Sequence, residues 1–264
     1  MAGIEYDQHT AERYRAAREV PREGLTAWRE AIAAASGLRP GDTVLDLGAG
    51  TGAFATAFRD WFDVRVLAVE PAAAMRAVLL GQLGPADERI RVLDGRGEAL
   101  PLPDGCADAA WLGSVLHHLS DAAATARELH RVLRPGAPVL IRNLFPGRAE
   151  RDLRVRFFPE TAAGVADYPS AEQVAGVFAG AGFRRVSLTS LPQRSAATLE
   201  EYADRLNQDS DSKLRALTAE QYAAGLARLR DAARRHPAEP ATSWMDLLVL
   251  ARTEGGSGDA DAAR

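Results

Sequence analysis

The chain has 264 residues, of which 47% are apolar and 26% charged, and these values are typical of a globular protein. The formal net charge is −4 and basic residues alternate with acidic ones, so we expect no nucleic-acid partner held by charge. No apolar run approaches the ~18 residues of a membrane span, which predicts a soluble, cytoplasmic protein with no membrane partner. Cys106 is the only cysteine, which excludes an intrachain disulfide, and "CADAAWL" is expected to place it in a buried strand.

Two helical stretches are expected at the start of the chain, at about 10–18 and 23–36. From residue 43 onward, apolar strand-like runs alternate with amphipathic helical runs. The expected strands are 43–47, 65–70, 90–94, 106–112 and 138–144, and the expected helices are 53–62, 72–83 and 121–133. This alternation predicts a parallel sheet with helices on both faces and a ligand at the carboxyl ends of its strands.

The pattern is looser after residue 145. A helix is expected within 169–183, a strand at 184–191, mainly helical structure over 198–235 and a closing strand at 243–253. We interpret 195–240 as a helical insertion on the same core, which makes 1–254 one domain. The polar, glycine-rich residues 255–264 are expected to form a disordered tail.

Three glycines, Gly48, Gly50 and Gly52, separate the first expected strand from the helix that follows it. Glycines there let the backbone turn tightly and let a ligand lie against bare amides. The helix N-terminus suits an anion, either a dinucleotide pyrophosphate or the carboxylate of an amino-acid-like cofactor. The spacing is G-x-G-x-G and not the G-x-G-x-x-G of dinucleotide sites. Glu70 ends the second strand, where a carboxylate would accept hydrogen bonds from ribose hydroxyls.

The motifs "VLDLGAGTG", "AVEP", "GEALPLPDGCAD", "LHHLSD" and "ELHRVLRPGAPVLI" occur in this order along the chain. Together they resemble the class I S-adenosylmethionine-dependent methyltransferases, in the small-molecule subgroup related to ubiquinone/menaquinone C-methyltransferases. The resemblance covers about 10–190. It implies an α/β fold with a doubly wound, mostly parallel seven-stranded sheet whose last strand is antiparallel. N-terminal helices, within 1–36, would cover the cofactor, and the helical insertion would form a lid.

The same resemblance implies S-adenosyl-L-methionine as cofactor. Gly48, Ala49 and Gly50 would face its methionine part, Asp46 would act through their loop or on the cofactor's amino group, and Glu70 would bind both ribose hydroxyls. Four further residues fall at cofactor-binding positions of the family: Met75, Gly97, Glu98 and Ser114.

Two of these adenine-side positions leave alternatives open. Met75 would lie against the adenine or pack in the core. Many relatives have an aspartate that accepts from the adenine amino group, where this chain has Arg96, which can only donate. The Gly97 amide would still reach the adenine, and the way the amino group is held stays open.

The N-terminal segment "YDQHTAERYRAAR" resembles the part that folds over the cofactor in related enzymes. Tyr14 and Arg18 lie four residues apart, on one face of a helix. Arg18 would pair with the cofactor carboxylate, and Tyr14 would close the methyl pocket against the acceptor. The alternative is a surface helix that packs on the sheet.

His117 and His118 follow the fourth strand and are the candidate catalytic residues. An imidazole titrates near neutral pH, so either could take a proton from an acceptor, and His118 is also expected to touch substrate. The alternative is that one caps the loop and the other packs. The remaining histidines are scattered along the chain: His9, His130 and His236. We therefore expect no metal.

Asn143, at the end of the fifth strand, is expected to meet the acceptor. Phe157 and Phe158 would supply an apolar wall to the acceptor site or belong to the core. Because the helical insertion would roof this site, we expect a small, partly apolar acceptor, a secondary metabolite of natural-product biosynthesis, methylated on carbon, nitrogen or oxygen.

Two other readings compete with a methyltransferase: a nicotinamide-dependent oxidoreductase on a similar sheet, and a non-catalytic cofactor-binding protein. The Ala53 and Phe54 that follow the third glycine count against the first of these. Monomer and homodimer are both compatible with the sequence.

Overall fold

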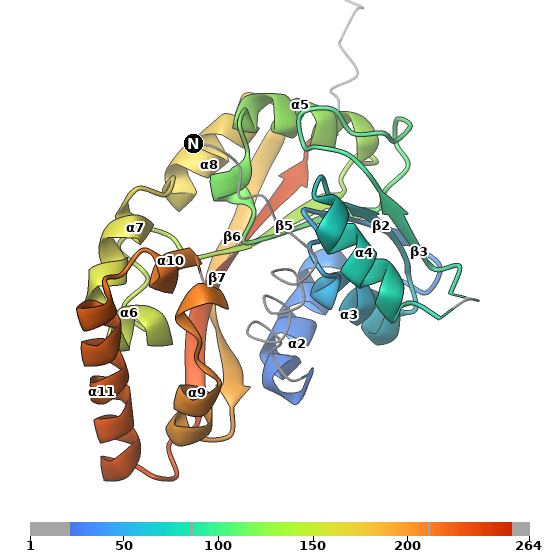
Figure 1. Ribbon diagram of the computed structural model, residues 1–264. Coiled ribbons are helices and arrows are strands. Elements are labelled where there is room, and N and C mark those ends of the chain that lie inside the picture. The colour runs from blue at the N-terminus through green and yellow to red at the C-terminus, as the bar shows by residue number, and fades with distance from the viewer. Residues whose placement is uncertain (1–21, 85–86, 211, 255–264) are drawn as a thin grey trace, which may run out of the picture.

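The computed structural model describes residues 22–84, 87–210 and 212–254 (Figure 1). The helix expected at 10–18 and the tail expected at 255–264 therefore lie outside the described residues. None of the helices that the structure describes is long and apolar enough to cross a membrane.

Seven strands form one sheet in the order β3-β2-β1-β4-β5-β7-β6. Their bounds are β1 Thr43–Leu47, β2 Arg65–Val69, β3 Ile90–Leu93, β4 Ala109–Gly113, β5 Pro138–Asn143, β6 Phe183–Ala196 and β7 Ala241–Arg252. Strand β7 runs antiparallel to both of its neighbours, and the other neighbouring pairs are parallel. The predicted sheet, with its last strand antiparallel, is confirmed.

Helices connect these strands. Their bounds are α2 Thr26–Ser36, α3 Ala53–Phe62, α4 Ala73–Gln82, α5 Ala122–Val132, α6 Leu153–Phe157, α7 Ala162–Ala166, α8 Ala171–Ala179, α9 Leu199–Arg205, α10 Ser212–Arg215 and α11 Ala219–Arg235. Single 3₁₀ turns are η1 Arg22–Leu25, η2 Leu116–His118, η3 Pro159–Thr161 and η4 Gln208–Ser210. Helices α6 and α7 were not predicted, because five residues are too few to show a helical period.

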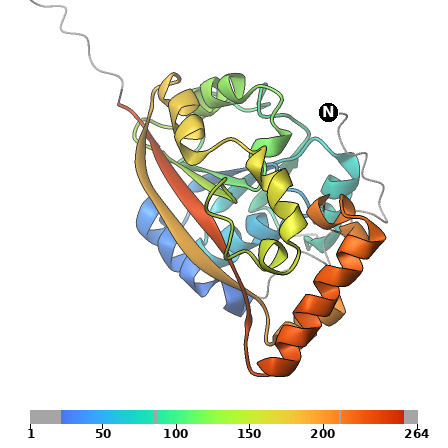
Figure 2. The same ribbon diagram turned by 90° about the vertical axis from the view of Figure 1, so that its left-hand side faces the viewer.

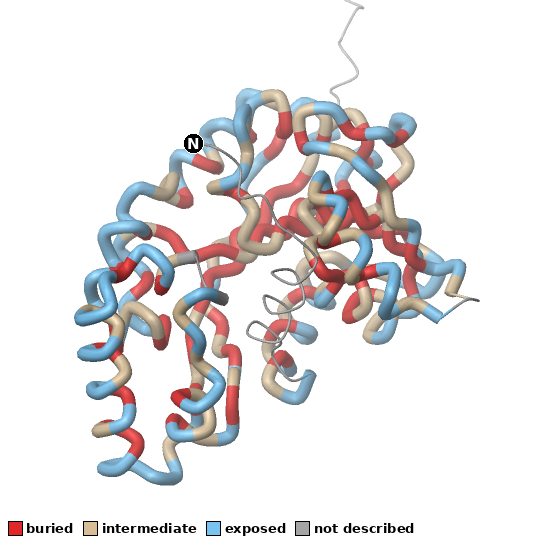
Figure 3. The backbone as a smooth tube through the Cα atoms, viewed as in Figure 1, coloured by how far each residue is buried: buried red, intermediate tan, exposed pale blue. Residues whose placement is uncertain are grey.

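The sheet is covered on both faces, as predicted. Helices α2, α3 and α4 pack on one face and α5 and α8 on the other. Along β1, Val44 joins the first group and Leu45 the second, which is the alternation that a strand buried on both faces requires. In Figure 3 the sheet is the continuous buried centre of the molecule.

A third apolar cluster lies beyond the sheet. Strands β6 and β7 extend past their neighbours and carry α9, α10 and α11 between them (Figure 2). Phe158, Leu199 and Leu229 are buried in this cluster. A Cβ on Gly225 of α11 would run into the Phe158 ring, so this glycine allows the helix to pack closely. The helical insertion thus lies between β6 and β7, close to its expected bounds.

Cys106 corrects one expectation. It lies ahead of β4, in irregular structure, and is only half-buried. The preceding Asp104-Gly105 turn, with a φ of 59° at Gly105, delays the start of the strand, so the prediction of a buried strand cysteine was wrong.

Candidate functional site

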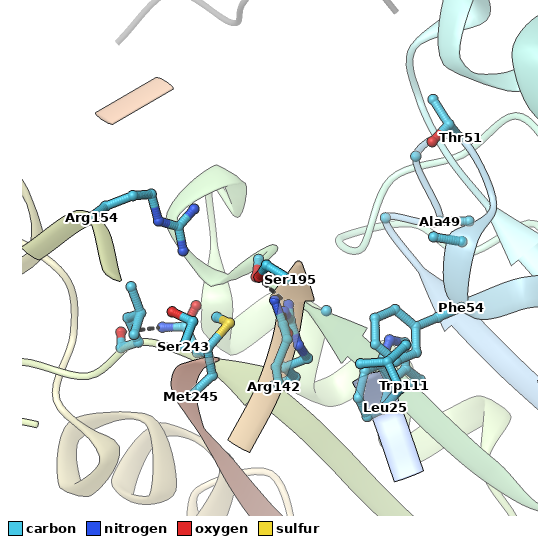
Figure 4. Close-up of a pocket in the computed structure, with 18 of the residues that line it drawn as sticks. Leu25, Ala49, Thr51, Phe54, Trp111, Arg142, Arg154, Ser195, Ser243 and Met245 are labelled. Atoms are coloured by element: carbon cyan, nitrogen blue, oxygen red, sulfur yellow. Dashed lines mark hydrogen bonds between the residues drawn. The ribbon is translucent and has the colours of Figure 1, made fainter. Parts of the chain in front are cut away.

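A cavity of about 310 Å³ opens at the carboxyl ends of β1, β4 and β5, where a doubly wound sheet places its ligand (Figure 4). We call one side the loop wall, formed by Asp46, Gly48, Ala49, Gly50, Thr51 and Phe54. We call the opposite side the insertion wall, formed by Arg154, Ser195, Tyr202, Lys213, Ser243 and Met245. One cavity therefore joins the predicted cofactor loop to the helical insertion.

The three glycines that follow β1 have positive φ angles, but only Gly50 faces open space. A Cβ on Gly48 would come within 2.6 Å of the Val115 side chain, and one on Gly52 would run into Leu79 of α4. A Cβ on Gly50, with φ at +55°, would meet no side chain within 4 Å. Gly48 and Gly52 are therefore needed for close packing, and Gly50 is where a ligand has room to approach the backbone.

Glu70 ties this loop to the end of β2. One carboxylate oxygen accepts a hydrogen bond from the Gly50 amide at 2.9 Å, and the other accepts from the Ala72 amide at 2.9 Å. Burial raises the pKa of Glu70, and these two amides oppose that effect. Each oxygen keeps a further lone pair for a ligand hydroxyl. The predicted ribose contact remains a prediction, and Glu70 in addition shapes the loop.

Asp46 is a buried carboxyl at the inner end of the loop wall, with 2% of its surface exposed. Its Oδ2 atom accepts no hydrogen bond from the residues that the structure describes. Burial, and then the charge of Glu70, raise the pKa of Asp46 to about 7, while a hydrogen bond from Ala55 works in the opposite direction. A buried carboxylate with an unused oxygen is suited to a cationic ligand, and S-adenosylmethionine carries a sulfonium and an ammonium group.

The two candidate catalytic histidines differ in exposure and in their place relative to the cavity. His117 lines the cavity, and its ring stacks on that of Tyr168, with centroids 4.7 Å apart and planes 7° from parallel. His118 is exposed and lies outside the cavity lining, with its ring 4.0 Å from that of His117. Only His117 is placed to act on a ligand in the cavity.

Residues at the carboxyl ends of β4 and β5 also belong to the lining of the cavity. Ser114 and Asn143 both line the cavity, and the Asn143 amide donates to the carbonyl oxygen of Leu144 at 2.8 Å. Arg142 also lines the cavity, between the two walls (Figure 4). Arg142 was not predicted from the sequence, although its place next to Asn143, a predicted strand-end contact, was an available signal.

Several predicted site residues do not line the cavity. Met75 is buried in α4. A Cβ on Gly97 would come within 2.8 Å of the Thr125 hydroxyl oxygen. Glu98 accepts hydrogen bonds from the backbone and hydroxyl of Ser120. Their cofactor contacts stay predictions.

On the acceptor side, Phe157 and Phe158 are buried in the third cluster, which is the core alternative that the sequence left open. Tyr14 and Arg18 lie outside the described residues. Among the residues that are described, no three His, Cys, Asp or Glu side chains are grouped so that they could hold a metal ion.

Comparisons with known proteins agree with this arrangement. Residues 45–141 match the family described as a methyltransferase domain. The 27-O-demethylrifamycin SV methyltransferase of Amycolatopsis mediterranei is 26% identical over 212 residues, which are 79% of this chain and 78% of that protein. The ubiquinone/menaquinone biosynthesis C-methyltransferase of Caulobacter vibrioides is 26% identical over 206 residues, 67% of this chain and 81% of that protein.

Among solved structures, the [4+2]-cyclase SpnF is similar with a TM-score of 0.60 and 20% identity, over 90% of this chain and 85% of that chain. At this identity the likeness shows the fold alone, since one fold hosts several reactions. The matched domain and the named relatives identify the reaction class. These findings support a class I S-adenosylmethionine-dependent methyltransferase related to the ubiquinone/menaquinone C-methyltransferases.

Proposed function

We propose that the protein methylates a carbon, nitrogen or oxygen of a small secondary metabolite, which binds between the insertion wall and the loop wall. The observation that carries this proposal is the continuity of the two walls around one cavity of about 310 Å³. A cavity of that size holds small molecules and does not admit a macromolecule. The name of the rifamycin relative supports a natural-product acceptor.

On the loop wall, the residues bind and orient the cofactor, which supplies an activated methyl group when bound. Gly50 lets the methionine part lie against the backbone, and Asp46 stabilises its positive charge. Glu70 accepts from the ribose hydroxyls while holding the Gly50 amide. We also propose that Met75, Gly97, Glu98 and Ser114 contact the cofactor. Tyr14 and Arg18 would belong to the segment that folds over it.

His117 takes a proton from the acceptor's hydroxyl, amine or activated carbon as the new bond forms. The stacked Tyr168 ring holds the imidazole plane, which limits the directions from which the acceptor can approach. Asn143 borders the acceptor, and we do not extend this role to His118, which lies outside the cavity lining. An acceptor nitrogen that is already unprotonated needs no base, and for such an acceptor the alignment of the nitrogen with the methyl group is sufficient.

The proposal also covers the cellular location, the oligomeric state and the domain organisation. We place the protein in the cytoplasm, as a monomer or homodimer without a nucleic-acid partner, and we assign 1–254 to one methyltransferase domain. Within it, 1–36 covers the cofactor and 195–240 forms the lid of the acceptor site.

The test is label transfer by the full chain. The protein is incubated with S-adenosylmethionine that carries an isotopic methyl label and with a panel of hydroxylated aromatics, quinols, amines and 27-O-demethylrifamycin SV. Mass spectrometry then reads the labelled product. Calorimetry compares S-adenosylmethionine, S-adenosylhomocysteine and NAD as ligands. We expect binding of the first two, none of NAD, and transfer to at least one small acceptor. Preferential binding of NAD, or label found on a macromolecule and on no small molecule, would overturn the proposal.

A further inference from the structure

We propose that Gln193 determines specificity for the acceptor, by donating a hydrogen bond from its side-chain amide to a carbonyl oxygen of that molecule. Arg142 is the positioning residue that fixes the orientation of this amide. The inference rests on the proposed function, because it names the chemical class of the molecule that enters the acceptor side of the cavity.

Gln193 is a buried amide on the acceptor side. It lies in β6, lines the cavity, and has 7% of its surface exposed. Its cross-strand partner Ser243, and Ser195 two positions further along β6, both belong to the insertion wall. Burying an amide is costly unless its polar atoms form hydrogen bonds. We therefore expect this amide to form them both with the protein and with what the cavity holds.

Arg142 decides which end of the amide the cavity meets. A terminal nitrogen of its guanidinium donates to the Oε1 atom of Gln193. Because a guanidinium has donors only, the amide cannot turn its nitrogen toward Arg142 without losing this bond. Strand β7 lies between β5 and β6, so the bond joins two strands that are not neighbours in the sheet. With Oε1 facing the guanidinium, the amide presents Nε2, which can only donate, to its other surroundings.

The guanidinium is itself held in place. Its carbon atom lies 5.3 Å from the centroid of the Trp28 ring and 5.5 Å from that of Phe54. Its other terminal nitrogen donates to the Ser114 hydroxyl at 3.1 Å. Because these contacts order Arg142 before a ligand arrives, the amide of Gln193 is also oriented in advance. Binding to it then costs little conformational entropy.

A fixed donor recognises an oxygen that accepts hydrogen bonds. The oxygen of a ketone, ester or amide only accepts, so it matches Nε2 of Gln193 without bringing a competing donor. A ligand that lacks such an oxygen leaves the buried donor unpaired, which costs more than the hydrogen bond itself contributes. Sites of this kind therefore discriminate strongly against analogues without the matching group.

The competing role of this amide is to bind the carboxylate of the cofactor. The two ends of the Arg142 guanidinium favour the acceptor. One end contacts Ser114, which follows β4, the neighbour of β1 and its glycine-rich loop. The other end contacts Gln193, which pairs with Ser243 of the insertion wall. The two roles predict different losses when Gln193 is replaced.

The test uses the full chain saturated with S-adenosylhomocysteine and two probes with the same carbon skeleton, acetophenone and 1-phenylethanol. The first presents a carbonyl, which only accepts, and the second a hydroxyl, which also donates. Ligand-observed NMR titration measures both dissociation constants. We expect the parent to bind acetophenone more tightly than 1-phenylethanol.

Gln193→Glu should reverse this preference. One carboxylate oxygen still accepts from Arg142, and the other places an acceptor where Nε2 was a donor. The ratio of the two dissociation constants should change by about tenfold, while the affinity for S-adenosylhomocysteine stays the same. Gln193→Met removes the amide without adding a charge, and it should bind the two probes about equally.

The matched control is Gln173→Glu, which makes the same chemical change at an exposed position of α8, outside the cavity lining. Glutamate can replace glutamine in the capping box that Gln173 forms, so this variant should fold and keep the parent's preference.

The positioning role of Arg142 has its own variants. Arg142→Met releases the amide, so the preference for acetophenone should fall to that of Gln193→Met. Arg142→Lys keeps a donor for Oε1 and should retain part of the preference. A parent-like preference in Arg142→Met would refute the positioning role.

Equal binding of both probes by the parent, or an unchanged preference in Gln193→Glu, would overturn the inference, as would a reversal in Gln173→Glu. A loss of S-adenosylhomocysteine affinity in Gln193→Glu would assign the amide to the cofactor instead. Failure of the parent to bind S-adenosylhomocysteine would refute the proposed function itself, which is a separate outcome.

Discussion

The two walls of the cavity are built in different ways. The loop wall comes from one short stretch of chain, in which a strand, three glycines and a helix follow one another within 43–62. The insertion wall collects side chains from α6, α9, α10, β6 and β7. The first wall is mainly a glycine-rich loop with one buried carboxyl, Asp46, and the second is a set of side chains from several elements. Under the proposed function, cofactor recognition would be local in sequence, whereas acceptor recognition would depend on tertiary packing.

The largest effect is expected at His117, which lines the cavity. If its imidazole is the general base, His117→Ala should lower the single-turnover rate by roughly 10²–10⁴-fold. Affinity for S-adenosylmethionine should hardly change, because the loop wall is untouched. His118→Ala is the matched control, since His118 is exposed and lies outside the cavity lining. The rate is measured with the acceptor found by label transfer, and a parent-like rate in His117→Ala would remove the base from the mechanism.

The difference between the walls also explains what could be predicted from sequence. The sequence placed Gly50 and Glu70 at one ligand site, whereas their direct hydrogen bond is a finding of the structure and was not predicted. Strand and helix order followed from apolar periodicity. In contrast, no local pattern places Arg142 near Gln193, because the pairing of β5, β7 and β6 brings them together.

After residue 145, the roles of apolar residues could not be decided from the sequence for the same reason. Phe157 and Phe158 suit a substrate wall and a core equally well by composition. Their burial is decided by α11, where Gly225 lets the helix pack against the Phe158 ring. Such a choice depends on a partner more than 60 residues away, so periodicity within a short window does not reveal it.

The second prediction separates ligand approach from packing within the loop wall. Asparagine tolerates a positive φ, so Gly50→Asn keeps the turn and places a side chain in the cavity. Filling that space should weaken binding of S-adenosylmethionine by about 10–100-fold, which corresponds to an overpacking cost of roughly 1–3 kcal/mol. Calorimetry measures the affinity, and thermal melting checks the fold.

Gly105→Asn is the control for this change. Gly105 has a φ of +59°, close to that of Gly50, and a Cβ there meets nothing within 4 Å, but it lies outside the cavity lining. It should melt and bind the cofactor like the parent. Equal binding losses in both variants would mean that backbone strain, and not the cavity, explains the glycine at position 50.

The third prediction concerns Asp46, whose pKa is raised to about 7 by burial and by the charge of Glu70. A cationic cofactor favours the ionised carboxylate, so affinity for S-adenosylmethionine should rise about tenfold from pH 6 to pH 8. Asp46→Asn should bind more weakly and lose most of this pH dependence. A pH dependence that persists unchanged in Asp46→Asn would assign it to another group.

The stability of the unliganded protein should change in the opposite direction. The pKa of Asp46 is higher in the folded chain than its ordinary value of 3.8, so folding favours the protonated form. The corresponding stabilisation is complete below that ordinary value and is lost as pH rises towards about 7. The melting temperature of the parent relative to Asp46→Asn should therefore fall between pH 5 and pH 8, by about 5–10 °C.

The smallest expected effect is the loss of a helix cap, which we compare between a helix that packs on the sheet and a helix of the insertion. Ser170 and Gln173 form a capping box at the start of α8, and Thr218 and Gln221 form one at the start of α11. Replacing either cap residue by alanine should cost about 1 kcal/mol. Because α8 packs on the sheet core, Ser170→Ala should lower the global free energy of unfolding by that amount.

Helix α11 belongs to the separate third cluster, so the cost in Thr218→Ala should appear as local opening. Hydrogen exchange of the α11 amides should become about fivefold faster, while the amides of β1 and β4 exchange as in the parent. Cofactor affinity should be unchanged and acceptor binding weaker, since the opening loosens only the insertion wall. If Thr218→Ala instead speeds exchange equally in the sheet and in α11, the insertion and the sheet unfold as one unit, and the acceptor wall is as rigid as the loop wall.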